Sequence, residues 1–260
     1  MKMRSSGLLG SRLRFVMFGA CATISAACAQ AQPTATAGAA PQAGAKPGAK
    51  PRAAGVKGTA HLRVLHAIVG GPSVDVYVDG KKALEGVSYK GLSPYLDVPS
   101  GSHVLALRLA GSEAASAPIA TLKRSLAAEG YFVAAAATVG SKPVILVQNE
   151  TTGKGSEKRA SVRFYHLSPD AGPVSISAPS ASRMAKNGTR SVVKELLPGK
   201  SRSASLPSGS TTLSLSAGGK VLKQVPVAVE AGHRYAAFAV GKAGGTGDEA
   251  LEVIVKPVAK

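Results

Sequence analysis

The sequence is poor in cysteine and in aromatic residues, and both shortages exclude classes of protein. The 260 residues include two Cys and no Trp, and aromatic residues make up 4% of the chain. Zinc ribbons and iron–sulfur proteins need clusters of cysteine ligands, and small disulfide-stapled domains need several cysteine pairs. Proteins that bind single-stranded nucleic acid stack its bases on aromatic side chains. We therefore expect no cofactor, no metal site and no nucleic-acid partner.

The chain also lacks an apolar run long enough to span a membrane, and its N-terminal run is typical of a signal peptide. Residues 1–14 hold four basic residues and no acidic one, and residues 15–27 carry no charge. Such a run is shorter than the roughly 20 residues of a spanning helix and fits the core of a signal peptide. Small residues predict cleavage near Ala29 or Ala31. We expect a signal peptide at 1–29 and a mature chain in the periplasm or cell envelope, without a transmembrane segment.

Acylation is the alternative to soluble export. The lipid would then be carried by Cys21 or Cys28, although neither has the Leu or Val that usually stands three residues before a lipid-bearing cysteine. If the chain is instead cleaved as a soluble protein, both cysteines leave with the signal peptide. The mature protein would then have no thiol nucleophile and no thiolate ligand.

A segment of low complexity follows the signal peptide. Residues 30–57 are almost entirely Ala, Pro, Gly, Gln, Thr and Lys, and Val56 is the one large aliphatic residue. Because such a segment cannot bury enough apolar area to offset its ordering entropy, we expect a disordered linker. Its basic residues fit either a weak anchor to an anionic surface or a solvated spacer.

The remainder of the chain repeats itself at a spacing of about 100 residues. Four blocks recur in the same order: 61–67 with 161–167, 96–109 with 204–217, 129–140 with 230–241, and 143–150 with 251–258. The period is too long for a solenoid repeat. We predict two homologous domains, at 58–152 and 153–260, whose boundary lies in the polar segment 151–158.

Alternating residues within the blocks predict strands. Val74, Val76 and Val78 should face inward, while the residues between them should face solvent. The pair Asp79-Gly80 predicts a hairpin turn, and the apolar run 131–139 predicts a buried strand. Short strands separated by Gly, Pro and Ser turns predict an all-β chain with two tandem antiparallel β-sandwich (Ig-like) domains.

Positive charge is concentrated in the second predicted domain. Residues 153–260 hold sixteen Lys and Arg against seven Asp and Glu, whereas residues 58–152 are nearly neutral. The densest basic stretch contains the residues that we expect to contact an acidic polymer or partner: Arg183, Lys186, Arg190 and Lys194. The alternative is a solvated loop that aids solubility.

Two histidines recur at equivalent places, His66 in the first copy and His166 in the second. Histidines on separate domains form a metal site only if the domains fold onto each other. We therefore expect a structural histidine that is hydrogen-bonded at a strand end.

The remaining polar residues do not form a persuasive catalytic pattern. The chain has no GxSxG elbow, and its serines recur in PSGS turns. Asp75 and Asp79, with Asp97 elsewhere, fit a loose cation site, but a solvated strand face is the preferred interpretation. We expect no catalytic residue and no enzymatic activity.

Two segments of the first copy resemble a large family of exported bacterial domains of unknown function. Residues 74–80 read VDVYVDG and residues 95–101 read YLDVPSG, which are typical of that family. Residues 162–176 resemble it more weakly, since the second copy lacks the VYVDG segment. The resemblance implies a fold and no chemistry.

The tandem layout is also similar to the AlgF family of periplasmic accessory proteins of alginate O-acetylation. The segments 164–168, 197–201 and 225–232 resemble the course of its second domain, whereas VYVDG is not typical of it. The resemblance implies a non-catalytic protein that binds an anionic polysaccharide or a periplasmic acetyltransferase complex. Our expectation is an accessory factor in exopolysaccharide O-acetylation. The alternative is a structural or adhesive module of the cell envelope.

Overall fold

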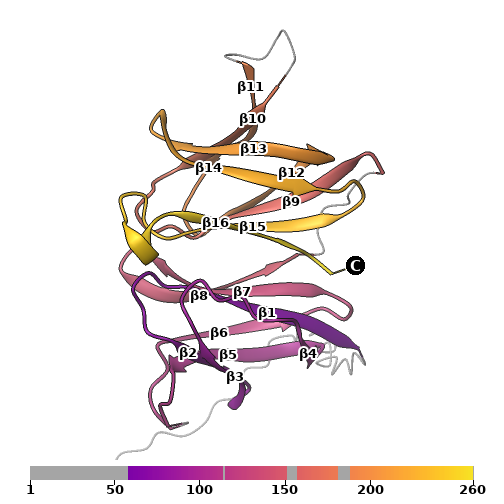
Figure 1. Cartoon of the computed structure of the whole chain (residues 1–260). Coiled ribbons are helices and arrows are strands. Elements are labelled where there is room, and N and C mark those ends of the chain that lie inside the picture. Colours follow the sequence, from indigo (N-terminus) through magenta and orange to yellow (C-terminus); the bar gives the residue numbers. More distant parts are fainter. Residues whose placement is uncertain (1–57, 114, 151–156, 181–187, 260) are drawn as a thin grey trace, which may run out of the picture. The chain divides into compact units, whose positions relative to one another are not determined.

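The structure is a computed structural model, which describes residues 58–113, 115–150, 157–180 and 188–259 (Figure 1). The predicted signal peptide and linker, with both cysteines, lie outside the described residues, as does most of the predicted boundary segment. The described strands all fall within one compact unit, residues 53–260. No helix among the described residues is both long and apolar enough to cross a membrane.

Sixteen strands form four sheets in the part of the chain that the structure describes. The first half consists of β1 (Thr59–Ala67), β2 (Val74–Val78), β3 (Lys81–Val87), β4 (Leu96–Pro99), β5 (Gly101–Leu109), β6 (Ala120–Leu126), β7 (Tyr131–Val139) and β8 (Lys142–Asn149). The second half consists of β9 (Arg159–His166), β10 (Val174–Pro179), β11 (Thr189–Leu196), β12 (Ser201–Pro207), β13 (Gly209–Ala217), β14 (Lys220–Val229), β15 (Arg234–Val240) and β16 (Glu252–Pro257), with a short 3-10 helix at Gly247–Glu249. The predicted all-β fold is confirmed.

The two halves have the same strand order. The sheets of the first half run β4-β1-β7-β8 and β3-β2-β5-β6, and those of the second half run β12-β9-β15-β16 and β11-β10-β13-β14. Adding eight to each strand number in the two sheets of the first half gives the strand orders of the two sheets of the second half. The duplication predicted from four sequence blocks is therefore present in the topology (Figure 1).

One strand pair in each half differs from the antiparallel arrangement that the sequence predicts. β1 pairs in parallel with β7, and β9 pairs in parallel with β15, whereas the other pairs between the named strands are antiparallel. Side-chain alternation has a period of two in both kinds of sheet, so it carries no information on strand direction. The prediction of two sandwiches holds, and the parallel pairs are a feature that it missed.

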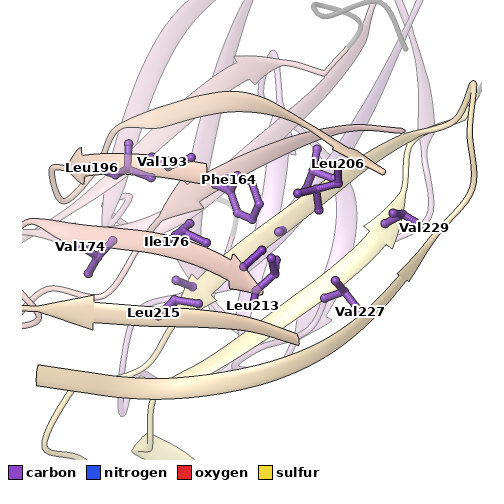
Figure 2. Packing of buried hydrophobic residues seen from close by; sticks show 14 of the residues in the cluster. Phe164, Val174, Ile176, Val193, Leu196, Leu206, Leu213, Leu215, Val227 and Val229 are labelled. Atoms are coloured by element: carbon purple, nitrogen blue, oxygen red, sulfur yellow. The ribbon is translucent and has the colours of Figure 1, made fainter. Parts of the chain in front are cut away.

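Each half has its own apolar core between its two sheets. Figure 2 shows the core of the second half, where residues of β10 and β13 meet residues of β9 and β12. Ile176 and Leu215 lie directly opposite each other and are both buried. Each fully buried side chain of this size contributes about 1.5–3 kcal/mol of transfer free energy. The alternation of apolar and polar residues in the sequence of these strands thus correctly predicts which face is turned to the core.

A third buried cluster joins the two halves. It combines Leu65 of β1 and Ala135 of β7 with Tyr165 of β9 and Phe238 of β15. Both faces of β1 and β7 are consequently buried, which explains the unbroken apolar run of β7 (Tyr131–Val139). The buried strand predicted at 131–139 is thus confirmed, because a second sheet covers the face of β7 that would otherwise meet water.

Candidate functional site

The structure places only part of the predicted basic site. Arg183 and Lys186 lie outside the described residues, whereas Arg190 and Lys194 lie on β11. Arg190 is paired with Ala178, which is buried in the core of the second half. Because residues directly opposite each other share a face, Arg190 is on the core side of β11. Lys194 lines a surface hollow on the other side, so the two residues do not form one cluster.

This hollow, of about 650 Å³, lies on the outward face of the sheet that contains β10 and β11. Its lining is rich in hydroxyl groups and holds one charge of each sign: Ser175, Ile176, Ser177, Thr189, Ser191, Lys194 and Glu195. Hydroxyls both donate and accept hydrogen bonds, an ammonium group donates, and a carboxylate accepts. The lining therefore offers both donors and acceptors to a polar ligand.

A row of polar side chains extends from the hollow across the whole sheet. Ser191 of β11 is paired with Ser177 of β10, which is paired with Ser214 of β13, and Ser214 is paired with Gln224 of β14. Direct pairing places these four residues on one face. The opposite face carries the buried residues of the core, so the row faces away from the core. The sequence contains this signal as alternating serines in 174–177 and 213–216, which our sequence analysis did not interpret.

A second hollow lies between the edge strands β3 and β4 of the first half. It measures about 450 Å³, and its lining includes His103, Asp79 and Pro99. The Nδ1 atom of His103 is 2.6 Å from Asp79 Oδ2, and its Nε2 atom is 2.6 Å from the carbonyl oxygen of Pro99. Both partners are hydrogen-bond acceptors, so the ring is held between the Asp79 side chain and the backbone of Pro99.

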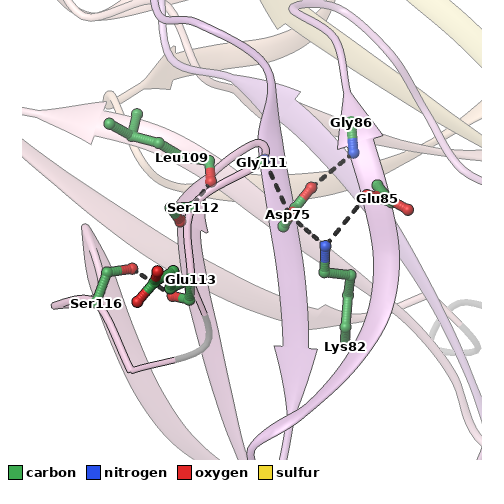
Figure 3. Close-up of polar contacts among 9 residues, drawn as sticks. All are labelled: Asp75, Lys82, Glu85, Gly86, Leu109, Gly111, Ser112, Glu113 and Ser116. Carbon is green, nitrogen blue, oxygen red and sulfur yellow. Dashed lines mark hydrogen bonds and ion pairs between the residues drawn. The ribbon is translucent and has the colours of Figure 1, made fainter.

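Asp75 is fully buried on β2, contrary to the expected solvated strand face. Figure 3 shows its carboxylate next to the Lys82 ammonium, with Oδ2 to Nζ at 2.8 Å. The backbone N–H groups of Gly86 and Gly111 also donate to it, at 2.8 and 3.3 Å. The hydrogen bond from Lys82 is the main cause that lowers the pKa of Asp75. The carboxylate is thus engaged in holding β2, β3 and the segment after β5 together.

A second buried ion pair joins β1 to the end of β8. Arg63 donates to both carboxylate oxygens of Glu150, at 2.8 and 2.7 Å, and Tyr95 donates to the same carboxylate at 2.8 Å. Arg63 also donates to the carbonyl oxygen of Pro257, at 3.2 Å, in the second half. Burial raises the pKa of Tyr95. Our sequence analysis missed this cluster. The one arginine in the block 61–67 was the signal for it.

The recurring histidines are structural, as predicted. His66 is fully buried and its Nε2 atom is 2.9 Å from the carbonyl oxygen of Pro72, while its Nδ1 atom accepts from the N–H of Ile68. His166 is equally buried, with Nε2 at 2.7 Å from the carbonyl oxygen of Gly172. Burial lowers the pKa of both imidazoles. Each histidine therefore forms a hydrogen bond that holds the segment after its strand in place.

A comparison with protein families finds one described as a domain of unknown function (DUF4397), whose sequence profile matches residues 60–177. The match begins at the second residue of β1, spans the other strands of the first half and continues into β10. A comparison with curated protein sequences finds no match.

A comparison with solved structures finds several matches at low identity and low TM-score. The Bacillus anthracis TIE protein is similar over 68% of this chain, at 11% identity and a TM-score of 0.23, and this chain spans 32% of its length. A candidate cell adhesion protein from Bacteroides fragilis is similar over 78% of this chain and 98% of its own, at 10% identity and a TM-score of 0.23. A candidate cell adhesion protein from Parabacteroides distasonis is similar over 78% of this chain and 100% of its own, at 9% identity and a TM-score of 0.22.

At these identities and TM-scores the similarities carry no inference about function. None of the descriptions mentions O-acetylation. The expected similarity to accessory proteins of alginate O-acetylation is therefore not supported, whereas the resemblance to a family of domains of unknown function agrees with the matching profile.

Proposed function

We propose that this protein is an exported module of the cell envelope or cell surface that binds a hydroxylated polymer without catalysing a reaction. The observation that carries the proposal is the polar row on the outward face of the second half, from Ser191 through Ser177 and Ser214 to Gln224. Sheet strands lie about 4.8 Å apart, so such a row offers a hydrogen-bonding group at a regular interval. A polysaccharide chain lying across the strands presents hydroxyl groups at repeated positions and can use several of them at once.

The charge of the second half gives this binding a preference for acidic polymers. Residues 153–260 hold sixteen basic and seven acidic residues, and an excess of one sign raises the local concentration of oppositely charged ligands. Lys194 lies in the hollow, and among the described residues its ammonium group has no ion-pair partner. Arg183 and Lys186 remain proposed contacts, whereas Arg190 is on the core side of β11 and does not share the outward face with Lys194. An accessory role in polymer O-acetylation would be a narrower proposal. Neither the geometry nor the comparisons support that narrower role.

The non-catalytic part of the proposal rests on what the buried ionisable groups do. Asp75 is held by Lys82 and two backbone donors, and Glu150 is held by Arg63 and Tyr95. These carboxylates are engaged in packing the strands, and neither lines the two hollows described above. The hollow on the outward face is lined instead by hydroxyls and a single pair of charges, which suits binding.

Affinity electrophoresis of the full chain tests this function. The gels would contain polygalacturonate as an acidic polymer, dextran as a neutral one, or no polymer. We expect retardation by polygalacturonate that weakens at high salt, because exposed charge contacts are screened. Replacing Lys194 with Ser should reduce the retardation, and the matched change Lys123→Ser on β6 of the first half should not. Absence of retardation by either polymer, or an equal effect of both substitutions, would contradict the proposal.

A further inference from the structure

The open side of the first sandwich differs from the other sandwich sides. β6 packs against β8 on the opposite side of the first half, and in the second half β11 packs against β12 and β14 against β16. The guanidinium group of Arg202 also reaches from β12 to the carbonyl oxygen of Lys194 on β11, at 3.5 Å. β3 and β4 make fewer contacts with each other than these strand pairs do, and a groove of about 450 Å³ lies between them. The β3–β4 side of the first copy is therefore open, whereas the equivalent β11–β12 side of the second copy is closed.

The groove combines an apolar lining with backbone groups at a sheet edge. Val78, Ala83, Leu96 and Val98 supply apolar surface. Among the described strands, β3 pairs only with β2 and β4 pairs only with β1, so each has one edge without a strand partner. An exposed edge offers unpaired N–H and C=O groups that another extended chain can pair with. Pro99 ends β4 and has no N–H, which leaves β3 as the better template.

The charges around the groove leave one positive group without an internal partner. The Lys82 ammonium is held by Asp75 at 2.8 Å and by Glu85 at 3.2 Å. Asp79 is paired with His103, and Asp97 is paired with His61. For the Lys81 ammonium, by contrast, no ion pair is formed within the described part of the chain. Lys81 is therefore the basic residue of the groove lining that is left to pair with a carboxylate on the β3 side.

We propose that this groove binds an extended acidic peptide segment of a partner protein. The segment pairs its backbone with the edge of β3, places alternate apolar side chains against Ala83 and Val98, and sets a carboxylate on Lys81. Strand addition of this kind takes affinity from main-chain hydrogen bonds and specificity from the alternate side chains. This interaction is separate from polymer binding, because it uses the other half of the chain.

Fluorescence anisotropy of the full chain with a labelled nonapeptide, Val-Thr-Val-Ser-Glu-Ser-Val-Thr-Val, tests the proposal, because its central Glu shares one face of the extended chain with the four Val side chains. We expect saturable binding of this peptide. A peptide with Lys in place of the central Glu should bind about tenfold more weakly, since one exposed charge contact is replaced by repulsion. A peptide with Pro at the position after Glu should not bind, because Pro cannot donate to the added strand.

Variants of the protein locate the binding site. Lys81→Glu should weaken binding of the acidic peptide and restore binding of the Lys peptide, whereas Lys123→Glu on β6 should change neither. Ala83→Trp fills the groove from an exposed position and should abolish binding, while Ser125→Trp on β6 should not. Thermal unfolding checks that each variant is folded. The proposal is overturned if the acidic peptide does not bind, or if either groove variant binds it as the parent chain does.

Discussion

Asp75 is a fully buried acidic side chain of the first half, and three donors surround it. The ammonium group of Lys82 lies 2.8 Å from one oxygen, and the N–H groups of Gly86 and Gly111 complete the set. A buried carboxylate is tolerated when such donors replace the water that it has lost. Two of these donors lie on β3 and the third follows β5, so the Asp75 side chain connects β2 with both segments.

Replacing Asp75 with Ala should therefore destabilise the protein by about 3 kcal/mol, because the two backbone donors lose their acceptor inside the fold. The matched change Asp97→Ala removes a carboxylate that is 74% exposed and should cost far less. Urea denaturation followed by circular dichroism measures both. Equal losses for the two variants would show that Asp75 has no special structural role.

The buried histidines predict how stability depends on pH. The pKa values of His66 and His166 are lowered from 6.5 by burial, so the unfolded chain binds protons at a higher pH than the folded one. Stability is then fully present above pH 6.5 and is lost as the pH falls below that value. We expect the double variant His66→Gln and His166→Gln to lose less stability than the parent between about pH 7 and about pH 5.

Denaturant titrations at several pH values measure this difference. The control is the variant His61→Gln, because that ring is partly exposed and lies 2.7 Å from Asp97 on the surface. If the parent and the double variant lose stability in parallel as the pH falls, the two buried imidazoles are not responsible for the pH dependence.

At the scale of residues, the sequence predicts polar turns and strand ends better than buried charges. The structural role of His66 and His166 follows from their recurrence at the ends of equivalent strands. The burial of Asp75 and Arg63 does not follow, because alternation assigns each of them to a solvated face. Arg63 pairs with Glu150, which is distant in the chain, and Asp75 pairs with Lys82 across an irregular part of the β2–β3 pairing. A single sequence does not reveal which donor will meet which acceptor.

At the scale of elements, the hairpin between β2 and β3 shows how local sequence sets structure. Asp79 and Gly80 both have positive φ, at 50° and 79°, which matches a two-residue turn of the primed type. Glycine adopts this conformation without steric cost. Val78 and Lys81 are paired directly across the turn, so the turn sets the starting register of β3 and the position of the groove beside it.

The substitution Gly80→Ala should cost about 1–2 kcal/mol, because a Cβ at positive φ is strained. Nothing lies within 4 Å of the position that the added Cβ would take, so the strain is confined to the backbone. Gly244→Ala is the control, since that glycine also has open space and does not have positive φ. Thermal unfolding compares them, and an equal effect at both sites would contradict the turn assignment.

The strands themselves are largely predictable, whereas their pairing is not. The apolar run predicted at 131–139 has the same bounds as β7, and the repeated blocks fall on corresponding strands of the two halves. The pattern of apolar and polar residues that predicts a strand lies within that strand, so it can be found without knowing the rest of the fold. The parallel pairing of β1 with β7 depends on how distant segments meet, and the outward serines of β10 and β13 became a row only once their register was known.

At the scale of the whole molecule, the cluster that joins the halves predicts cooperative unfolding. Phe238 is fully buried there and stacks on Tyr165 with ring centroids 4.8 Å apart. Lys90 of the first half is paired with Glu252 of the second at 2.8 Å. Two halves that share a buried cluster of this kind should unfold in one transition.

Calorimetry of the full chain tests this expectation through the ratio of the calorimetric to the van't Hoff enthalpy, which should be close to unity. The variant Phe238→Ala should lose about 3–5 kcal/mol and bring the two halves toward separate transitions. Leu213→Ala, in the core of the second half alone, is the control. Two separate transitions in the parent chain would show that the shared cluster does not couple the halves.

The location of the polymer on the outward face of the second half is the central claim, and hydrogen–deuterium exchange with polygalacturonate tests it most directly. The claim predicts slower exchange in β10, β11 and β13 when the polymer is added to the full chain, with little change in β3 and β4. Protection of the Lys194→Ser variant should be weaker at the same polymer concentration. Protection confined to the first half, or no protection in any strand, would contradict the claim.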